Sequence, residues 1–155
     1  GCELPVIINS GSGNQGMTAS LPVIEYAKEL GSSEEELYRA LVLSNLITIH
    51  QKTGIGRLSA YCGAVSAGCG AGCGIAFLVG ADYKTIAHTL VNGLAIVSGI
   101  ICDGAKPSCA GKIAAAESWD TICISMVSSL KAATASCPRE WKIPSPMWAV
   151  SEKME

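Results

Sequence analysis

Residues 61–74 read Tyr-Cys-Gly-Ala-Val-Ser-Ala-Gly-Cys-Gly-Ala-Gly-Cys-Gly, and no charged residue occurs between Arg57 and Asp82. A second largely apolar, uncharged run extends from Thr85 to Cys102. The first run has little of the bulk of a lipid-facing helix, whereas small side chains let buried helices approach closely. The sequence therefore predicts a hairpin of two buried helices. A pair of membrane-spanning helices is the alternative, because each run is long enough to cross a bilayer.

The residues around this hairpin also indicate helices. Residues 1–16 end in a Gly-, Ser- and Asn-rich loop, and residues 17–30 then carry apolar side chains at helical spacing before Gly31. Ser32 and Ser33 precede three glutamates, which predicts a capped helix up to Gly54. Leu37, Leu41, Asn45, Thr48 and Lys52 should lie on one side of this helix.

A turn is expected at residues 103–108, where a glycine and a proline interrupt the apolar run. A further helix should then begin at Ser108 or Cys109. Together these segments predict an all-α fold, a compact helical domain with Gly/Cys-rich buried helices.

The composition limits the partners of the chain. Hydrophobic residues make up 49% of its 155 residues and charged residues 15%, where a soluble domain typically has about 25% charged residues. Much of the surface should therefore face something other than water, and a homo-oligomer would be consistent with this. The net charge is -2 and there is no basic cluster, so the sequence does not predict binding to the phosphate backbone of nucleic acid.

Eight cysteines are many for this length. We find no signal peptide with a charged and then an apolar region, so reduced thiols and a cytoplasmic location are expected. In that compartment an excess of cysteine indicates metal binding or catalysis before disulfides. No Cys-x2-Cys pair is present, so any metal site must combine distant segments.

Two groups of thiols are candidates for such a site. Cys62, Cys69 and Cys73 follow a spacing that places them on one face of a helix, although each could equally be a packing residue. Cys102 and Cys109 flank a tight Gly/Pro loop, so their thiols can converge on one point. The second pair is therefore the stronger candidate for ligands.

Other polar residues give weaker signals. Asn-Ser-Gly-Ser-Gly-Asn-Gln-Gly at residues 9–16 precedes a predicted helix and suits a carboxylate or phosphate, although an ordinary capped loop would look the same. His50 and His88 are expected to be core histidines rather than ligands. No catalytic base is assigned.

Three segments together resemble a known family: residues 9–16, residues 61–74, and Cys-Asp-Gly-Ala-Lys-Pro-Ser-Cys at 102–109. In this order they are similar to the C-terminal domain of the L-cysteine desulfidase family, which is related to the bacterial iron-sulfur L-serine dehydratase alpha chain. The resemblance covers roughly residues 3–125.

This resemblance implies a pyridoxal-independent lyase with a 4Fe-4S cluster held by three cysteines. Its open iron would act as a Lewis acid on the leaving group of L-cysteine, or alternatively L-serine, and the products would be pyruvate and ammonia. Cys62 and Cys102 match the ligand positions. The third ligand is Cys109 if the dehydratase pattern holds, or a cysteine of the N-terminal half if the desulfidase pattern holds. Ser10, Ser12 and Asn14 would bind the small amino-acid substrate.

Two features depart from the family. Whole desulfidases are longer, so we expect this chain to be a fragment or truncated form that is inactive without the N-terminal half of the enzyme. Residues 1–130 form the family-like domain, whereas residues 131–155 are an atypical tail. The amino acids of the tail are compatible with codons that, when read one nucleotide out of phase, encode motifs of the family. This suggests that a reading-frame shift produced the tail. The alternative function is a catalytically silent helical module with packing cysteines.

Overall fold

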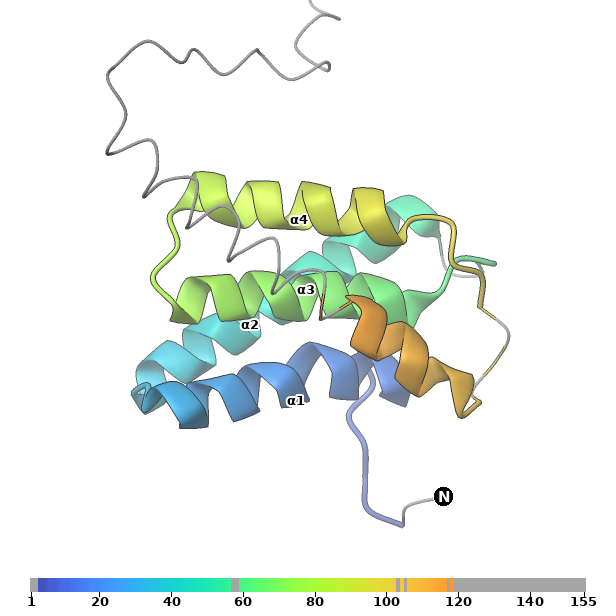
Figure 1. Ribbon diagram of the computed structural model, residues 1–155. Coiled ribbons are helices and arrows are strands. Elements are labelled where there is room, and N and C mark those ends of the chain that lie inside the picture. The colour runs from blue at the N-terminus through green and yellow to red at the C-terminus, as the bar shows by residue number, and fades with distance from the viewer. Residues whose placement is uncertain (1–2, 57–58, 103, 105, 117, 119–155) are drawn as a thin grey trace, which may run out of the picture.

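The computed structural model describes residues 3–56, 59–102, 104, 106–116 and 118. They form four long helices: α1 (Gly13–Leu30), α2 (Glu34–Ile55), α3 (Gly63–Leu78) and α4 (Tyr83–Val97). A shorter helical segment follows at residues 108–116, drawn in orange in Figure 1. Over these described residues the only β-type pairing is two isolated bridges. The all-α prediction is confirmed, and the predicted tail at 131–155 lies outside the described residues.

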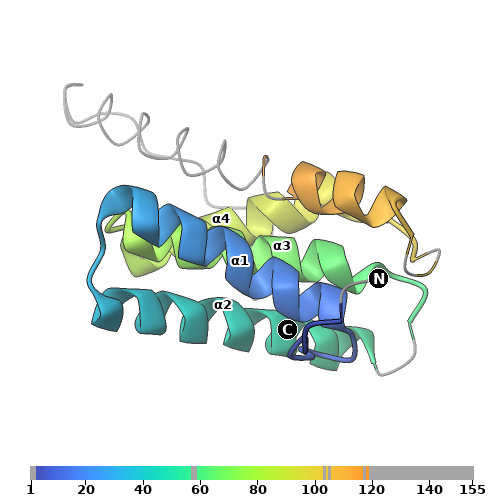
Figure 2. The ribbon, with the colours of Figure 1, turned by 90° about the horizontal axis from the view of Figure 1, so that it is seen from below.

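Helix α3 is the centre of the molecule. Helices α1, α2 and α4 each pack against it, and α1 also packs against α2 (Figures 1 and 2). Every residue of α3 from Gly63 to Ala76 is buried. The central position explains why this helix consists mainly of glycine, alanine and cysteine, because larger side chains would hold its neighbours apart.

Helix α2 approaches α3 almost to backbone contact. A Cβ atom built on Gly70 would lie 2.7 Å from the carbonyl oxygen of Ser44, and one built on Gly74 would lie 3.0 Å from that of Ala40. Accordingly, the buried residues of α2 are Ala40, Ser44 and Thr48. The five residues predicted to share one side of α2 are all buried or half-buried. Thr48 is fully buried, while Leu37 and Leu41 pack at the edge of the core. Small residues lie nearest α3, because they fit against a glycine-rich helix.

Helix α4 is buried along one face only. Thr85, Thr89, Gly93 and Val97 face inwards, whereas Tyr83 is 85% exposed. The predicted hairpin is present, but its second helix is not buried on all sides. Among the described helices, none combines the length and the apolar character that a membrane span requires.

Capping residues set the starts of the first two helices. Helix α1 begins at Gly13, four residues before the expected start, because the Ser12 side chain accepts a hydrogen bond from the Gln15 N–H and caps the helix. At α2, Ser33 and Glu36 form a reciprocal capping box. The Ser33 backbone N–H donates to the Glu36 carboxylate and holds the pKa of Glu36 below its usual value.

The contact between α2 and α3 predicts opposite effects for two Gly-to-Ala substitutions. Gly70→Ala should destabilise the fold by about 1–3 kcal/mol, because its methyl group would overlap the Thr48 side chain and the Ser44 carbonyl. Gly54→Ala, in α2, has no atom within 4 Å of the new methyl group and should stabilise the fold by up to about 1 kcal/mol. Urea denaturation followed by circular dichroism measures both. Equal stabilities of the two variants would contradict the packing described here.

Candidate functional site

A cavity of about 330 Å³ lies at the end of the bundle where α1 and α3 begin. Three cysteines, Cys62, Cys102 and Cys109, line it. The first turn of α1 and the first turn of α3 line it as well. The cavity therefore combines residues from all three sequence segments that carry the family resemblance.

Two backbone hydrogen bonds hold Cys62 and Cys102 side by side. The Cys62 N–H donates to the Ile100 carbonyl over 3.0 Å, and the Cys102 N–H donates to the Ala60 carbonyl over 2.7 Å. The two segments thus form a short antiparallel bridge ahead of α3. Cysteines 40 positions apart in the sequence are fixed next to each other by main-chain contacts, which do not depend on their side chains.

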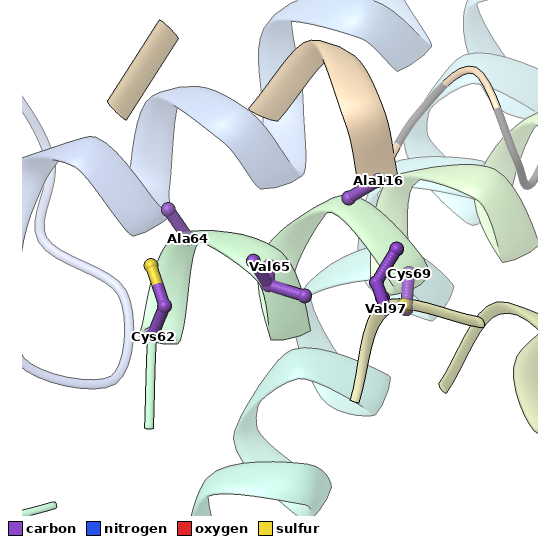
Figure 3. Close-up of a cluster of buried hydrophobic side chains, with 6 residues drawn as sticks. All are labelled: Cys62, Ala64, Val65, Cys69, Val97 and Ala116. Carbon is purple, nitrogen blue, oxygen red and sulfur yellow. The ribbon is translucent and has the colours of Figure 1, made fainter. Parts of the chain in front are cut away.

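Cys62 is the N-cap residue of α3, in an extended conformation, and not part of the helix. Figure 3 shows its sulfur on the side of α1 and apart from Cys69. Cys69 and Cys73 lie inside α3 with no exposed surface, and neither lines the cavity. The prediction that Cys62, Cys69 and Cys73 share one helix face was therefore wrong, because the helix begins one residue after Cys62.

Cys109 lies in the first turn of the helical segment at 108–116, as the turn residues before it predicted. Its Sγ atom donates to the Gly104 carbonyl over 3.4 Å. From the next turn, the Lys112 ammonium donates to the Ile101 carbonyl over 3.0 Å. These contacts tie the segment at 108–116 to residues 101 and 104, and both Cys102 and Cys109 line the cavity.

The polar residues of the predicted substrate loop separate into two groups. Ser12 and Asn14 line the cavity with the cysteines. Ser10 instead lines another cavity beside Lys52, and its hydroxyl donates to the Asn9 side chain over 2.5 Å. Ser10 has a φ of 55°, in the left-handed region, so its contribution is to the tight turn that positions Ser12.

Gln15 is a cavity residue that the sequence did not single out. It is 8% exposed, and its amide lies on Gly63, where a Cβ atom would approach the Gln15 Cδ to 2.5 Å. Gly63 therefore allows the first turns of α1 and α3 to meet. The sequence signal was present, since Gln15 lies within the quoted motif at residues 9–16, but nothing in the pattern indicated that its side chain turns inwards.

A general base is missing from the described part of the cavity wall. The described lining residues carry thiols, amides, a hydroxyl, a thioether and small apolar groups, and include no histidine, carboxylate or lysine. His50 and His88 are both exposed and lie away from this cavity, so the expectation that they are core histidines was wrong.

The three thiols line one cavity but are not grouped as the ligands of a single metal ion. Over the described ranges, no three Cys, His, Asp or Glu side chains are grouped closely enough to hold one ion, which would need ligands at about 2.0–2.3 Å from a common centre. In a cluster each cysteine binds a different iron, so the thiolates surround a volume instead of meeting at a point. Three thiols around one cavity, all free of disulfides, match that donor set.

The burial of the thiols predicts their reactivity. Cys102 is exposed, Cys62 and Cys109 are 5% and 8% exposed, and Cys69 and Cys73 are fully buried. Brief alkylation of the reduced, metal-free chain should therefore modify Cys102 first, Cys62 and Cys109 next through the cavity, and Cys69 and Cys73 last. Peptide mass spectrometry gives the order, and the chain in guanidinium chloride, where all sites should react alike, is the control. Early modification of Cys69 would contradict the arrangement.

The chain is similar to known proteins. The family model described as serine dehydratase alpha chain matches residues 1–153. A UPF0597 protein of Desulfitobacterium hafniense is 80% identical over 116 residues, which are 75% of this chain and 27% of that protein. A UPF0597 protein of Lachnoclostridium phytofermentans is 63% identical over 131 residues, or 84% of this chain and 31% of that protein.

The chain covers only a part of the length of these relatives. In the two matches above, it spans only 27% and 31% of the curated relatives. No solved structure matches the chain. The family match, in contrast, covers nearly all of it. The chain belongs to the serine dehydratase alpha chain family.

Proposed function

We propose that this chain is the cluster-binding part of a pyridoxal-independent lyase that eliminates sulfide from L-cysteine, or water from L-serine, to give pyruvate and ammonia. The observation that carries the proposal is the single cavity lined by Cys62, Cys102 and Cys109. Membership of the serine dehydratase alpha chain family supports it. The relatives' printed names add no substrate, so the choice between cysteine and serine rests on the resemblance of the motifs.

The residues of the chain would hold and orient a 4Fe-4S cluster. Cys62 and Cys102 would be held in place by the main-chain bridge between their segments, and Cys109 by the first turn of the segment at 108–116. When bound, the cluster would supply a Lewis-acidic iron for the leaving thiol or hydroxyl group. Burial of Cys62 and Cys109 would keep water away from two of the three thiolates.

Ser12 and Asn14 are the proposed substrate-binding residues from the predicted loop, because both line the cavity with the thiols. Ser10 is left out of this proposal, since its hydroxyl is bonded to Asn9 and it lines a different cavity. Ser12 keeps a structural task as well, because its hydroxyl caps α1.

The proposal also requires the rest of the enzyme. The described cavity wall lacks a group that could remove the α-proton. Large apolar side chains along the outer side of α2, Tyr38, Val42, Leu46 and Ile49, are 46–59% exposed. Apolar surface of this kind is typical of an interface with another domain. We therefore propose the N-terminal half of the same enzyme as the partner that completes the site.

Anaerobic reconstitution with iron and sulfide tests the cluster. The chain should gain the broad charge-transfer absorbance of a 4Fe-4S cluster, and Cys62→Ser, Cys102→Ser and Cys109→Ser should each lose most of the bound iron. Cys69→Ala is the matched control, because Cys69 lies in the core and not at the cavity, and it should keep the wild-type iron content.

Each other result has a defined meaning. No cluster in the chain alone, with one restored when the N-terminal half is added, would place the third ligand in that half. Equal iron content in the wild type, Cys62→Ser and Cys102→Ser would contradict the proposal and favour a silent module in which the cysteines only pack.

A further inference from the structure

The cavity carries an unsatisfied acceptor beside two helix N-termini. The Oε1 atom of Gln15 is buried without a hydrogen-bond partner, although the Gln15 side chain lines the cavity and is only 8% exposed. A buried polar atom without a partner costs about 1–3 kcal/mol. A donor bound in the neighbouring cavity could supply the missing partner.

The same wall presents donors without intrahelical partners. The N–H groups of Gly13 and Asn14 in α1, and of Gly63 and Ala64 in α3, belong to first turns, where no preceding turn can accept their hydrogen bonds. The N-cap of α3 makes no side-chain hydrogen bond to this turn. Two helix N-termini facing one cavity concentrate positive potential there, which favours an anion.

We propose that this cavity recognises the zwitterionic head of an α-amino acid and that Gln15 is its specificity residue. The α-carboxylate binds at the first turns of α1 and α3, and the α-ammonium donates to Gln15 Oε1. The terminal amide torsion of glutamine is broad, so a small rotation turns Oε1 towards the ligand. The choice of an amino acid as ligand rests on the proposed function, whereas the pairing of an acceptor with an anion site rests on the geometry.

The close contact of Gln15 with Gly63 fixes the acceptor relative to the anion site. The amide packs on the backbone of the α3 first turn, and the Gln15 N–H is itself bonded to the Ser12 hydroxyl. The contact therefore keeps the Gln15 amide beside the N–H donors of the α3 first turn. A ligand that has a carboxylate but lacks the ammonium leaves Oε1 unsatisfied, so the site discriminates against it.

Unreactive ligands test this without the cluster. L-Alanine carries both charged groups and no leaving group, and propionate lacks only the ammonium. Calorimetry or ligand-observed NMR on the metal-free chain should show L-alanine binding roughly tenfold more tightly than propionate, as expected for one hydrogen bond to a charged group. Gln15→Leu should remove this preference, measured as the ratio of the two affinities, and Gln15→Glu should keep or raise it.

Gln51 supplies the matched control. Its Oε1 atom is also buried without a partner, but its Nε2 atom donates to the Ser66 carbonyl over 3.1 Å, and Gln51 does not line this cavity. Gln51→Leu should keep the wild-type preference for L-alanine. Far-UV circular dichroism and the urea unfolding midpoint show whether Gln15→Leu is folded.

Two results overturn the proposal: a Gln15→Leu variant that still prefers L-alanine, or a wild-type chain that binds neither ligand. Both are independent of iron content. If the chain binds no cluster but still prefers L-alanine, only the proposed lyase function is overturned. If the chain binds a normal cluster but does not prefer L-alanine, only the role of Gln15 is overturned.

Discussion

The close approach of neighbouring backbones to α3 is the constraint on which the rest of the structure depends. Gly63, Gly68, Gly70 and Gly74 each lie where a methyl group would meet another segment within 3.0 Å, so α1, α2 and the helical segment at 108–116 all reach this one helix. Few large apolar side chains are buried, since the core consists mainly of alanine, valine and cysteine. Dense packing of small groups therefore has to supply the cohesion that larger side chains give to most cores.

The site follows from that constraint. Because α3 is central, its N-terminus meets the N-terminus of α1 and the bridge that leads from residues 60–62 to residues 100–102. Cys62, Cys102 and Cys109 thus come from three separate segments and are positioned mainly by main-chain contacts. This arrangement suits a cofactor with several attachment points, because each thiol is fixed before the group arrives. Helix N-termini at the same wall add an anion-binding element beside the thiols.

Much of this fold was predictable, and particular residues show where prediction ended. The Ser-Ser-Glu-Glu-Glu signal located the start of α2, and the Gly/Pro loop between Cys102 and Cys109 located the helix after it. The position of Cys62 was not predictable from spacing, because a glycine-rich run gives no signal for the residue at which its helix begins. The inward turn of Gln15 was missed for a related reason: it depends on Gly63, a contact between segments 48 positions apart. His50 and His88 were misplaced because an apolar run in the sequence was taken as a buried face, whereas only small residues fit against α3.

The account's central claim is that cysteines from three segments face one cavity, and cross-linking in the native chain tests it most directly. The reduced, metal-free protein would be treated with a short bifunctional thiol reagent, digested, and mapped by mass spectrometry. We predict cross-links among Cys62, Cys102 and Cys109 and none from Cys69 or Cys73, which are buried within the core. Cross-links that join Cys102 to Cys69 as readily as to Cys62, or the absence of any link between Cys62 and Cys102, would contradict the account.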